Sequence, residues 1–190
     1  MIYIAPSKLN LTTDEIRNSI DVEKEPYLWK NVYGANCYAY ALGIDLKEDR
    51  IAECAYQPGV MGSVILKEPI INIKNMSFEE RLFLDLEALG IYYAEADPFD
   101  ETNYRLYYRK DSEIVSSISY SWLISLFEAG EDEFHFLRKG DSGLWIHKYG
   151  YSHKPTIYDE KTEMIYDPRE CDLGKYQYKK TYKLRLNKKC

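Results

Sequence analysis

Cys37 opens a short stretch whose residue types suit a nucleophile. Asn36 is a favourable helix N-cap, the alanine-rich run to Leu42 favours a helix, and Gly43 can end it in the left-handed conformation. Cys37 then falls in the first turn, where free backbone N–H groups and the positive end of the helix dipole stabilise a thiolate. The sequence therefore predicts a thiol with a lowered pKa. The competing interpretation is a small, inert residue of the core.

Two histidines lie about a hundred residues downstream, on two predicted strands at 133–138 and 144–147. Residues 141–143 form the loop between the strands, with a glycine suited to the left-handed position. In an antiparallel hairpin with an odd-numbered loop, residues of equal parity share a face. We therefore expect His135 and His147 on one face, opposite or diagonal to each other.

A cysteine at a helix N-terminus followed by two histidines on paired strands is the nucleophile, base and orienter layout of a thiol hydrolase. Cys37 would be the nucleophile, His135 the base, and His147 the group that fixes the tautomer and ring plane of His135. His153, in a separate loop, is expected to play no part. Asp167 is an alternative orienter, although an aspartate before a proline is more typical of a turn.

This arrangement, with Asn36-Cys37-Tyr38 at the nucleophile and the second histidine twelve residues after the first, resembles the NlpC-type branch of the papain-like cysteine hydrolases. The hairpin and the later Asp167-Pro168 are also similar to those of a set of bacterial and phage proteins. The resemblance implies a papain-like fold and a Cys-His-His site. Cleavage of peptidoglycan peptides is the usual activity of the branch, and it would require a partner such as a holin to bring the protein to the cell wall.

An enzyme of this kind also needs an oxyanion hole, made by the backbone N–H of the nucleophile and one further donor. The aromatic segment before the cysteine offers Tyr33 or Asn31 as that donor, and Asn36 is a further candidate for the cleft.

The elements that must position these residues are predicted from capping and periodicity. Thr12 and Glu15 form a capping box that opens a helix ending before Pro26, with Ile16 and Ile20 on its apolar face. Ser77 and Glu80 form a second one, and the helix that follows is expected to end at Gly90. Strands are expected at 91–94, 104–109, 119–127, 133–138, 144–147 and 179–186, and residues 63–66 and 70–73 are either short strands or one irregular connection.

Helices followed by an antiparallel sheet indicate an α+β fold, in which N-terminal helices pack on the sheet. The last strand alternates, with Tyr182, Leu184 and Leu186 on one side and Lys183 and Arg185 on the other, which is typical of a C-terminal edge strand protected by lysines. This basic strip could also hold an acidic protein partner.

The composition of the chain limits the number of domains and the classes of partner and cofactor that can be expected. The 190 residues, 45% hydrophobic, suit a single domain spanning residues 1–190. The net charge is −6, and because residues 175–190 hold seven basic and no acidic residues, the rest of the chain is strongly acidic and nucleic acid is not an expected partner. The four cysteines lack metal-ligand spacing, so no metal or organic cofactor is implied. With no signal peptide or long apolar run, we expect a cytoplasmic monomer that does not bind membranes.

The function predicted from the sequence is a cysteine hydrolase that cleaves a peptide, isopeptide or other amide bond through an acyl-thioester. Acyl transfer and glutamine deamidation use the same site and remain open. The competing class is a non-catalytic binding or inhibitor protein that uses the same cleft and the basic C-terminal strand.

Overall fold

The chain forms an α+β structure in which helices precede an antiparallel sheet. The computed structural model describes residues 20, 35–44, 57–66, 73–101, 106–107, 117–150 and 153–189. The helices with defined bounds are α2 (Cys37–Leu42), α3 (Val60–Leu66) and α5 (Phe78–Leu89), and residues 73–74 are also helical. The strands are β1 (Tyr92–Glu95), β2 (Leu106–Tyr107), β3 (Ser117–Ala129), β4 (Glu133–Lys139), β5 (Trp145–His147) and β6 (Gln177–Lys189).

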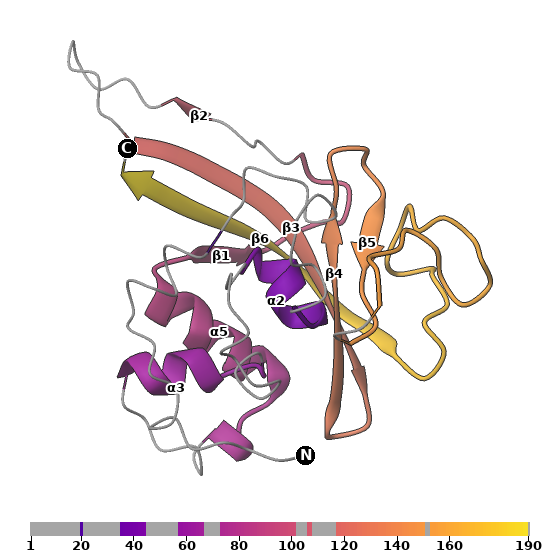
Figure 1. The fold of residues 1–190 in the computed structure, drawn as a ribbon, viewed down its shortest axis with the longest axis horizontal. Coiled ribbons are helices and arrows are strands. Elements are labelled where there is room, and N and C mark those ends of the chain that lie inside the picture. The colour runs from indigo at the N-terminus through magenta and orange to yellow at the C-terminus, as the bar shows by residue number, and fades with distance from the viewer. Residues whose placement is uncertain are drawn as a thin grey trace.

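The sheet has the order β1-β6-β3-β4-β5, with β2 paired to β3 beside this path, and all of its pairings are antiparallel. The long strands β3 and β6 lie together at its centre (Figure 1). The prediction that the last strand is an edge strand is therefore wrong. Its alternation of lysine and apolar residues has another cause: Tyr182 and Leu184 face the core, whereas Lys183 and Arg185 point to the opposite, more exposed face.

The two faces of the sheet are covered differently. Helices α2, α3 and α5 lie on one side of it (Figure 1), and the main core joins α2 and α5 to Trp122, Ile124 and Phe136 of the sheet. A second cluster on the other face joins Leu123 and Leu137 to residues of the C-terminal loops. Side chains of equal parity on β4 and β5 therefore face either the helices or these loops.

The expected ends of two helices are confirmed. Asn36 caps α2, and Gly43 ends it with φ 77°. At α5, the Ser77 side chain accepts a hydrogen bond from the Glu80 backbone N–H, and the Glu80 carboxylate accepts one from the Ser77 backbone N–H, so the capping box is complete. Gly90 ends α5 with φ 68°.

Two other predictions are wrong. Residues 63–66 belong to helix α3 rather than to a strand. The β-branched residues favoured a strand locally, but the buried Asp85 carboxylate accepts hydrogen bonds from the backbone N–H groups of Gly59 and Gly62 and so caps the first turn of α3. Ile20, expected on a helix, instead forms an isolated antiparallel bridge with Ile44.

The remaining strand predictions at 91–94, 119–127, 133–138, 144–147 and 179–186 are confirmed within a few residues. For 104–109 the structure describes only Leu106 and Tyr107, which form β2. The capping box at 12–15 lies outside the described residues, and of the segment 70–73 only Ile73 is described, where it is helical rather than extended. Among the helices that are described, none has the length and apolar character needed to span a membrane.

Candidate active site

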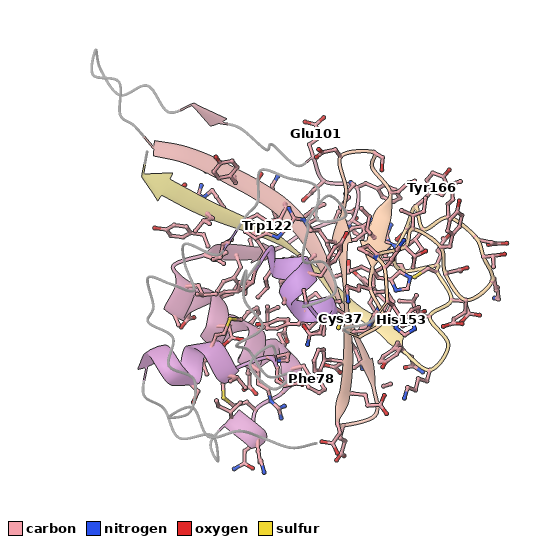
Figure 2. The ribbon with its side chains drawn as sticks, in the orientation of Figure 1. Cys37, Phe78, Glu101, Trp122, His153 and Tyr166 are labelled. Carbon is pink, nitrogen blue, oxygen red and sulfur yellow. The ribbon has the colours of Figure 1, made fainter. Side chains whose placement is uncertain are left out.

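Helix α2 presents Cys37 to the end of the sheet formed by β4 and β5. The Asn36 side chain accepts a hydrogen bond from the Ala39 N–H at 2.9 Å, which starts the helix at the cysteine. At its other end the Trp122 indole N–H donates to the Ala41 carbonyl at 3.0 Å and ties α2 to β3. Figure 2 shows Cys37 where α2 meets β4.

The electrostatics of Cys37 differ from the sequence-based prediction. Its side chain is only 6% exposed, and burial raises the pKa of the thiol to about 11. Backbone N–H groups of Phe136, Tyr38 and Cys37 itself, together with Lys148, act in the opposite direction. The prediction of a lowered pKa is therefore wrong, because desolvation of the thiolate outweighs the donors at the mouth of a six-residue helix.

His135 and His147 lie on one face of the hairpin, as predicted. The pairing of Leu137 with His147 places the two histidines diagonally, and the His135 Nε2 and His147 Nδ1 atoms are 3.0 Å apart. The loop at 141–143 has the expected length, since Gly140 N–H donates to the Leu144 carbonyl, and Gly143 has φ 82°.

The hydrogen bonds of this pair define both tautomers. His147 Nε2 lies 2.9 Å from the Tyr158 carbonyl oxygen, which can only accept, so Nε2 of His147 carries the proton. In the neutral ring Nδ1 is then an acceptor, and His135 must donate to it from Nε2. The proton of His135 is thereby assigned to Nε2, which leaves its Nδ1 as an unprotonated base.

Two tyrosines hold the His135 ring. Tyr149 stacks on it with ring centroids 5.3 Å apart, and Tyr176 packs against it at 5.3 Å with a tilt of 33°. Tyr149 also meets His147 edge-on at 4.7 Å, and its hydroxyl donates to Glu160. These contacts define an aromatic clamp, Tyr149 and Tyr176, that restricts the ring plane of His135.

Both histidines are neutral at physiological pH. Burial, with a smaller contribution from the neighbouring His147, lowers the pKa of His135 to about 3. Burial also lowers the pKa of His147, against the effect of the Tyr158 carbonyl, which accepts a hydrogen bond from its Nε2–H. The neutral state is the one that the two assigned tautomers require.

The cysteine and the histidines meet at β4. The Phe136 backbone N–H, which acts to lower the pKa of Cys37, belongs to the residue next to His135. Cys37 also contributes to the raised pKa of Tyr176, the ring that packs on His135. No hydrogen bond joins Cys37 to His135 or His147, all three of which are described. Cys37 and His135 therefore approach consecutive residues of β4 from opposite faces, since Phe136 packs against α2 whereas His135 shares the loop face with Leu137.

A buried carboxylate supports the helix mouth from behind. Asp85 of α5 accepts a hydrogen bond from the Tyr38 hydroxyl at 2.6 Å, in addition to the bonds from Gly59 and Gly62 of the α3 turn. Burial raises the pKa of Asp85 to about 7. Because Tyr38 follows Cys37 directly, this carboxylate connects the nucleophile helix to α3 and α5.

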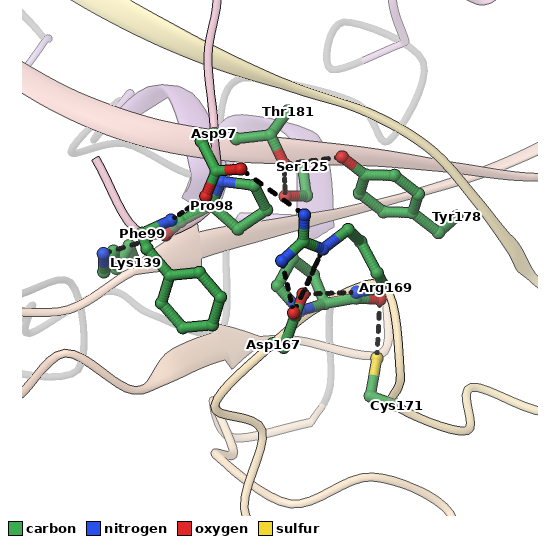
Figure 3. A network of polar contacts seen from close by, with 11 residues as sticks. Asp97, Pro98, Phe99, Ser125, Lys139, Asp167, Arg169, Cys171, Tyr178 and Thr181 are labelled. Carbon is green, nitrogen blue, oxygen red and sulfur yellow. Dashed lines mark hydrogen bonds and ion pairs between the residues drawn. The ribbon is translucent and has the colours of Figure 1, made fainter.

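The other residues singled out in the sequence have structural positions. Asn36 is the helix cap, and His153 is exposed. Asp167 accepts from the Arg169 backbone and guanidinium within the polar network of Figure 3 and bonds to neither histidine, so its role is that of a turn residue. Asn31 and Tyr33, the candidates for the second oxyanion donor, lie outside the described residues.

The sequence-based prediction missed four residues of the site: Lys148, Tyr149, Tyr176 and Asp85. Lys148 and Tyr149 follow His147 directly, and the parity that located the histidines also places Lys148 on the helix side. Asp85 interrupts the apolar pattern of α5 at a buried position, and this interruption could have identified it as a buried polar residue with a specific role. Tyr176 is one of 19 tyrosines and carried no distinguishing sign.

Comparison of the chain with protein-family models, with curated proteins and with solved structures gives no match. The functional argument therefore depends on the geometry of the site itself.

Proposed function

We propose that this protein is a cysteine hydrolase that cleaves an amide bond through an acyl-thioester, with Cys37 as nucleophile, His135 as base and His147 as orienter. The observation that carries the proposal is the relay from the Tyr158 carbonyl through His147 to His135. This relay leaves an unprotonated Nδ1 on His135, the residue next to Phe136, whose backbone N–H acts on the Cys37 thiol. A papain-like fold of the NlpC type is part of the same proposal.

In the first step the Cys37 Sγ–H bond breaks and the proton passes by way of one water to His135 Nδ1 as sulfur attacks the substrate carbonyl carbon. The imidazolium then returns the proton to the leaving amine, and a thioester remains on Cys37. Water, deprotonated by His135, releases the acid and restores the thiol. The carbonyl of Tyr158, acting through His147, stabilises the positive charge on His135 during both steps.

The resting state of this site is a neutral thiol beside a neutral imidazole. The pKa of Cys37 is about 11 and that of His135 about 3, so a preformed thiolate–imidazolium pair is a minor species. Proton transfer must accompany attack, as it does when serine is the nucleophile. Substrate binding that expels or orders water around the sulfur would be part of activation.

Covalent labelling with a peptidyl vinyl sulfone tests this proposal. We expect labelling of Cys37, a loss of at least about tenfold in rate in His135→Ala, and no labelling at this site in Cys37→Ala. His153→Ala is the matched control, because His153 is exposed and outside the relay. Equal labelling rates in the parent protein and in His135→Ala would contradict the hydrolase function.

A binding protein is the second candidate, and the burial of Cys37 with its raised thiol pKa is the observation that favours it. In that function the relay would be a structural element that fixes the hairpin. The labelling experiment separates the two functions, because a binding protein needs no base at His135.

A further inference from the structure

Lys148 is a buried cation at the end of β5. Its side chain is 0% exposed, and its Nζ donates a hydrogen bond to the Gly150 carbonyl. An ammonium group is costly to bury without compensating charge. Its environment should therefore contain groups that make this position favourable.

The alternation along β5 places Lys148 beside the nucleophile helix. His147 faces the C-terminal loops and bonds to His135, so its neighbours Ile146 and Lys148 face the other way. Ile146 packs against Tyr40 of α2. Cys37 lies about one helical turn before Tyr40, on the same side of α2, and Lys148 lies two residues after Ile146, on the same face of the sheet. Cysteine and lysine are therefore next to the Tyr40–Ile146 contact, each on its own element.

The charges of the two side chains affect each other in agreement with this placement. Lys148 acts to lower the pKa of Cys37, and Cys37 acts to raise the pKa of Lys148. Burial is the larger influence on Lys148 and lowers its pKa to about 8, so the amine is still mostly protonated at pH 7.

We infer, on the basis of the function proposed above, that Lys148 is the counter-ion of the Cys37 thiolate. When the thiol proton moves to His135, Lys148 keeps its own proton, and the negative sulfur forms beside a positive charge that is already in place. Consecutive residues then serve the two partners of the reaction: His147 orients the base, and Lys148 stabilises the nucleophile.

A purely structural lysine exists on the same hairpin and offers a matched control. Lys139 donates to the Pro98 carbonyl at 2.8 Å and to the Asp100 carbonyl at 3.3 Å, across the face opposite to α2. If Lys148 served only to hold the Gly150 carbonyl, its replacement would resemble that of Lys139 in its effect on the thiol.

The test measures the alkylation rate of Cys37 by iodoacetamide in the full chain, quantified by mass spectrometry of the Cys37 peptide. Lys148→Gln keeps a donor for the Gly150 carbonyl and removes the charge, whereas Lys148→Arg keeps the charge. At pH 7 we expect Lys148→Gln to react about tenfold more slowly than the parent, the effect of about one pKa unit, with Lys148→Arg and Lys139→Gln near the parent rate.

The pH dependence separates charge from structure. The pKa of Tyr176 is raised and that of His135 is about 3, so of these neighbours of Cys37 only Lys148 changes charge between pH 7 and 9. The difference between parent and Lys148→Gln should therefore shrink as the pH rises through about 8. Lys148→Met provides a second neutral variant if Lys148→Gln does not fold.

The inference is overturned if the neutral variant reacts at the parent rate or faster at pH 7, or if the difference does not change with pH. Alkylation does not require turnover, so this result is independent of the hydrolase proposal. If His135→Ala labels with the vinyl sulfone at the parent rate and the effect of Lys148→Gln still depends on pH, the hydrolase proposal is refuted but the ion pair between Cys37 and Lys148 is supported.

Discussion

The two histidines of the relay make different contributions because only His135 has an unprotonated ring nitrogen outside the relay. His135 supplies the base nitrogen, whereas His147 accepts a hydrogen bond from the His135 Nε2–H and donates one to the Tyr158 carbonyl. Removing the base abolishes proton transfer, whereas removing the orienter leaves nucleophile and base in place.

We therefore expect His135→Ala to lower the labelling rate of Cys37 by about 100-fold and His147→Ala by about tenfold. His147→Asn should recover part of the loss, because its amide can accept from His135 and donate to Tyr158. Rates from single-turnover labelling give the comparison. A larger loss in His147→Ala than in His135→Ala would reverse the assignment of base and orienter.

Asp85 should make the stability of the protein depend on pH. Its pKa rises from 3.8 to about 7 on folding, so its protonated form favours the folded state, and this contribution is lost as the pH rises from about 4 to about 7. The shift corresponds to on the order of 4 kcal/mol. His135, with its pKa lowered to about 3, has the opposite sign over part of this range, so the parent protein alone does not isolate either residue.

The measurement is urea unfolding of the parent and Asp85→Asn at pH 4.5, 6 and 8. The parent should lose stability relative to Asp85→Asn as the pH rises, because asparagine has no proton to release. A stability difference that stays constant across these pH values would contradict the raised pKa.

At the residue scale, the sequence predicted the positions of the site residues better than their protonation states. Parity alone located His135 and His147 on one face, because the pleat of a strand leaves little freedom. The prediction of a lowered pKa for Cys37 was wrong, because the desolvation of the thiol depends on how the core covers the start of α2. No local sequence pattern encodes that burial.

At the scale of elements, helix α5 depends on its first turn. The Ser77 and Glu80 capping box satisfies N–H groups that would otherwise be unpaired. Ser77→Ala should cost about 1 kcal/mol in the free energy of unfolding, measured with urea. Ser142→Ala, in the exposed hairpin loop, is the control and should change stability by less than about 0.5 kcal/mol. Equal effects of the two substitutions would contradict the cap.

The errors at this scale have a common origin. Val60–Leu66 forms a helix because a carboxylate from α5 caps it, and β6 lies inside the sheet because β1 pairs with it. Both outcomes depend on a partner distant in sequence. Ends marked by their own residues, such as Gly43 and Gly90, were predicted correctly.

At the scale of the whole molecule, Trp122 links the nucleophile helix to the centre of the sheet. Its indole N–H donates to the Ala41 carbonyl near the end of α2. Trp122→Phe leaves this carbonyl without its donor and should lower the free energy of unfolding by about 1–2 kcal/mol more than a tryptophan substitution that loses no hydrogen bond.

Trp145 provides that comparison. It is equally buried, but its indole N–H is among the buried groups of the described residues that have no hydrogen-bond partner. Trp145→Phe therefore removes packing without breaking a hydrogen bond, and thermal or urea unfolding of both variants gives the difference. A smaller loss in Trp122→Phe than in Trp145→Phe would show that the link to α2 contributes nothing.

The three-residue strand β5 has a consequence for evolution. The His147 side chain lies on the face of the C-terminal loops and that of Lys148, just after β5, on the face of α2, so deleting a single residue within β5 would exchange the faces of the imidazole and the amine. The loop at 141–143 is exposed and lies beyond the paired residues, so it can gain or lose residues without this exchange. Descendants of this chain should therefore vary in length at the hairpin tip and keep β5 free of insertions and deletions.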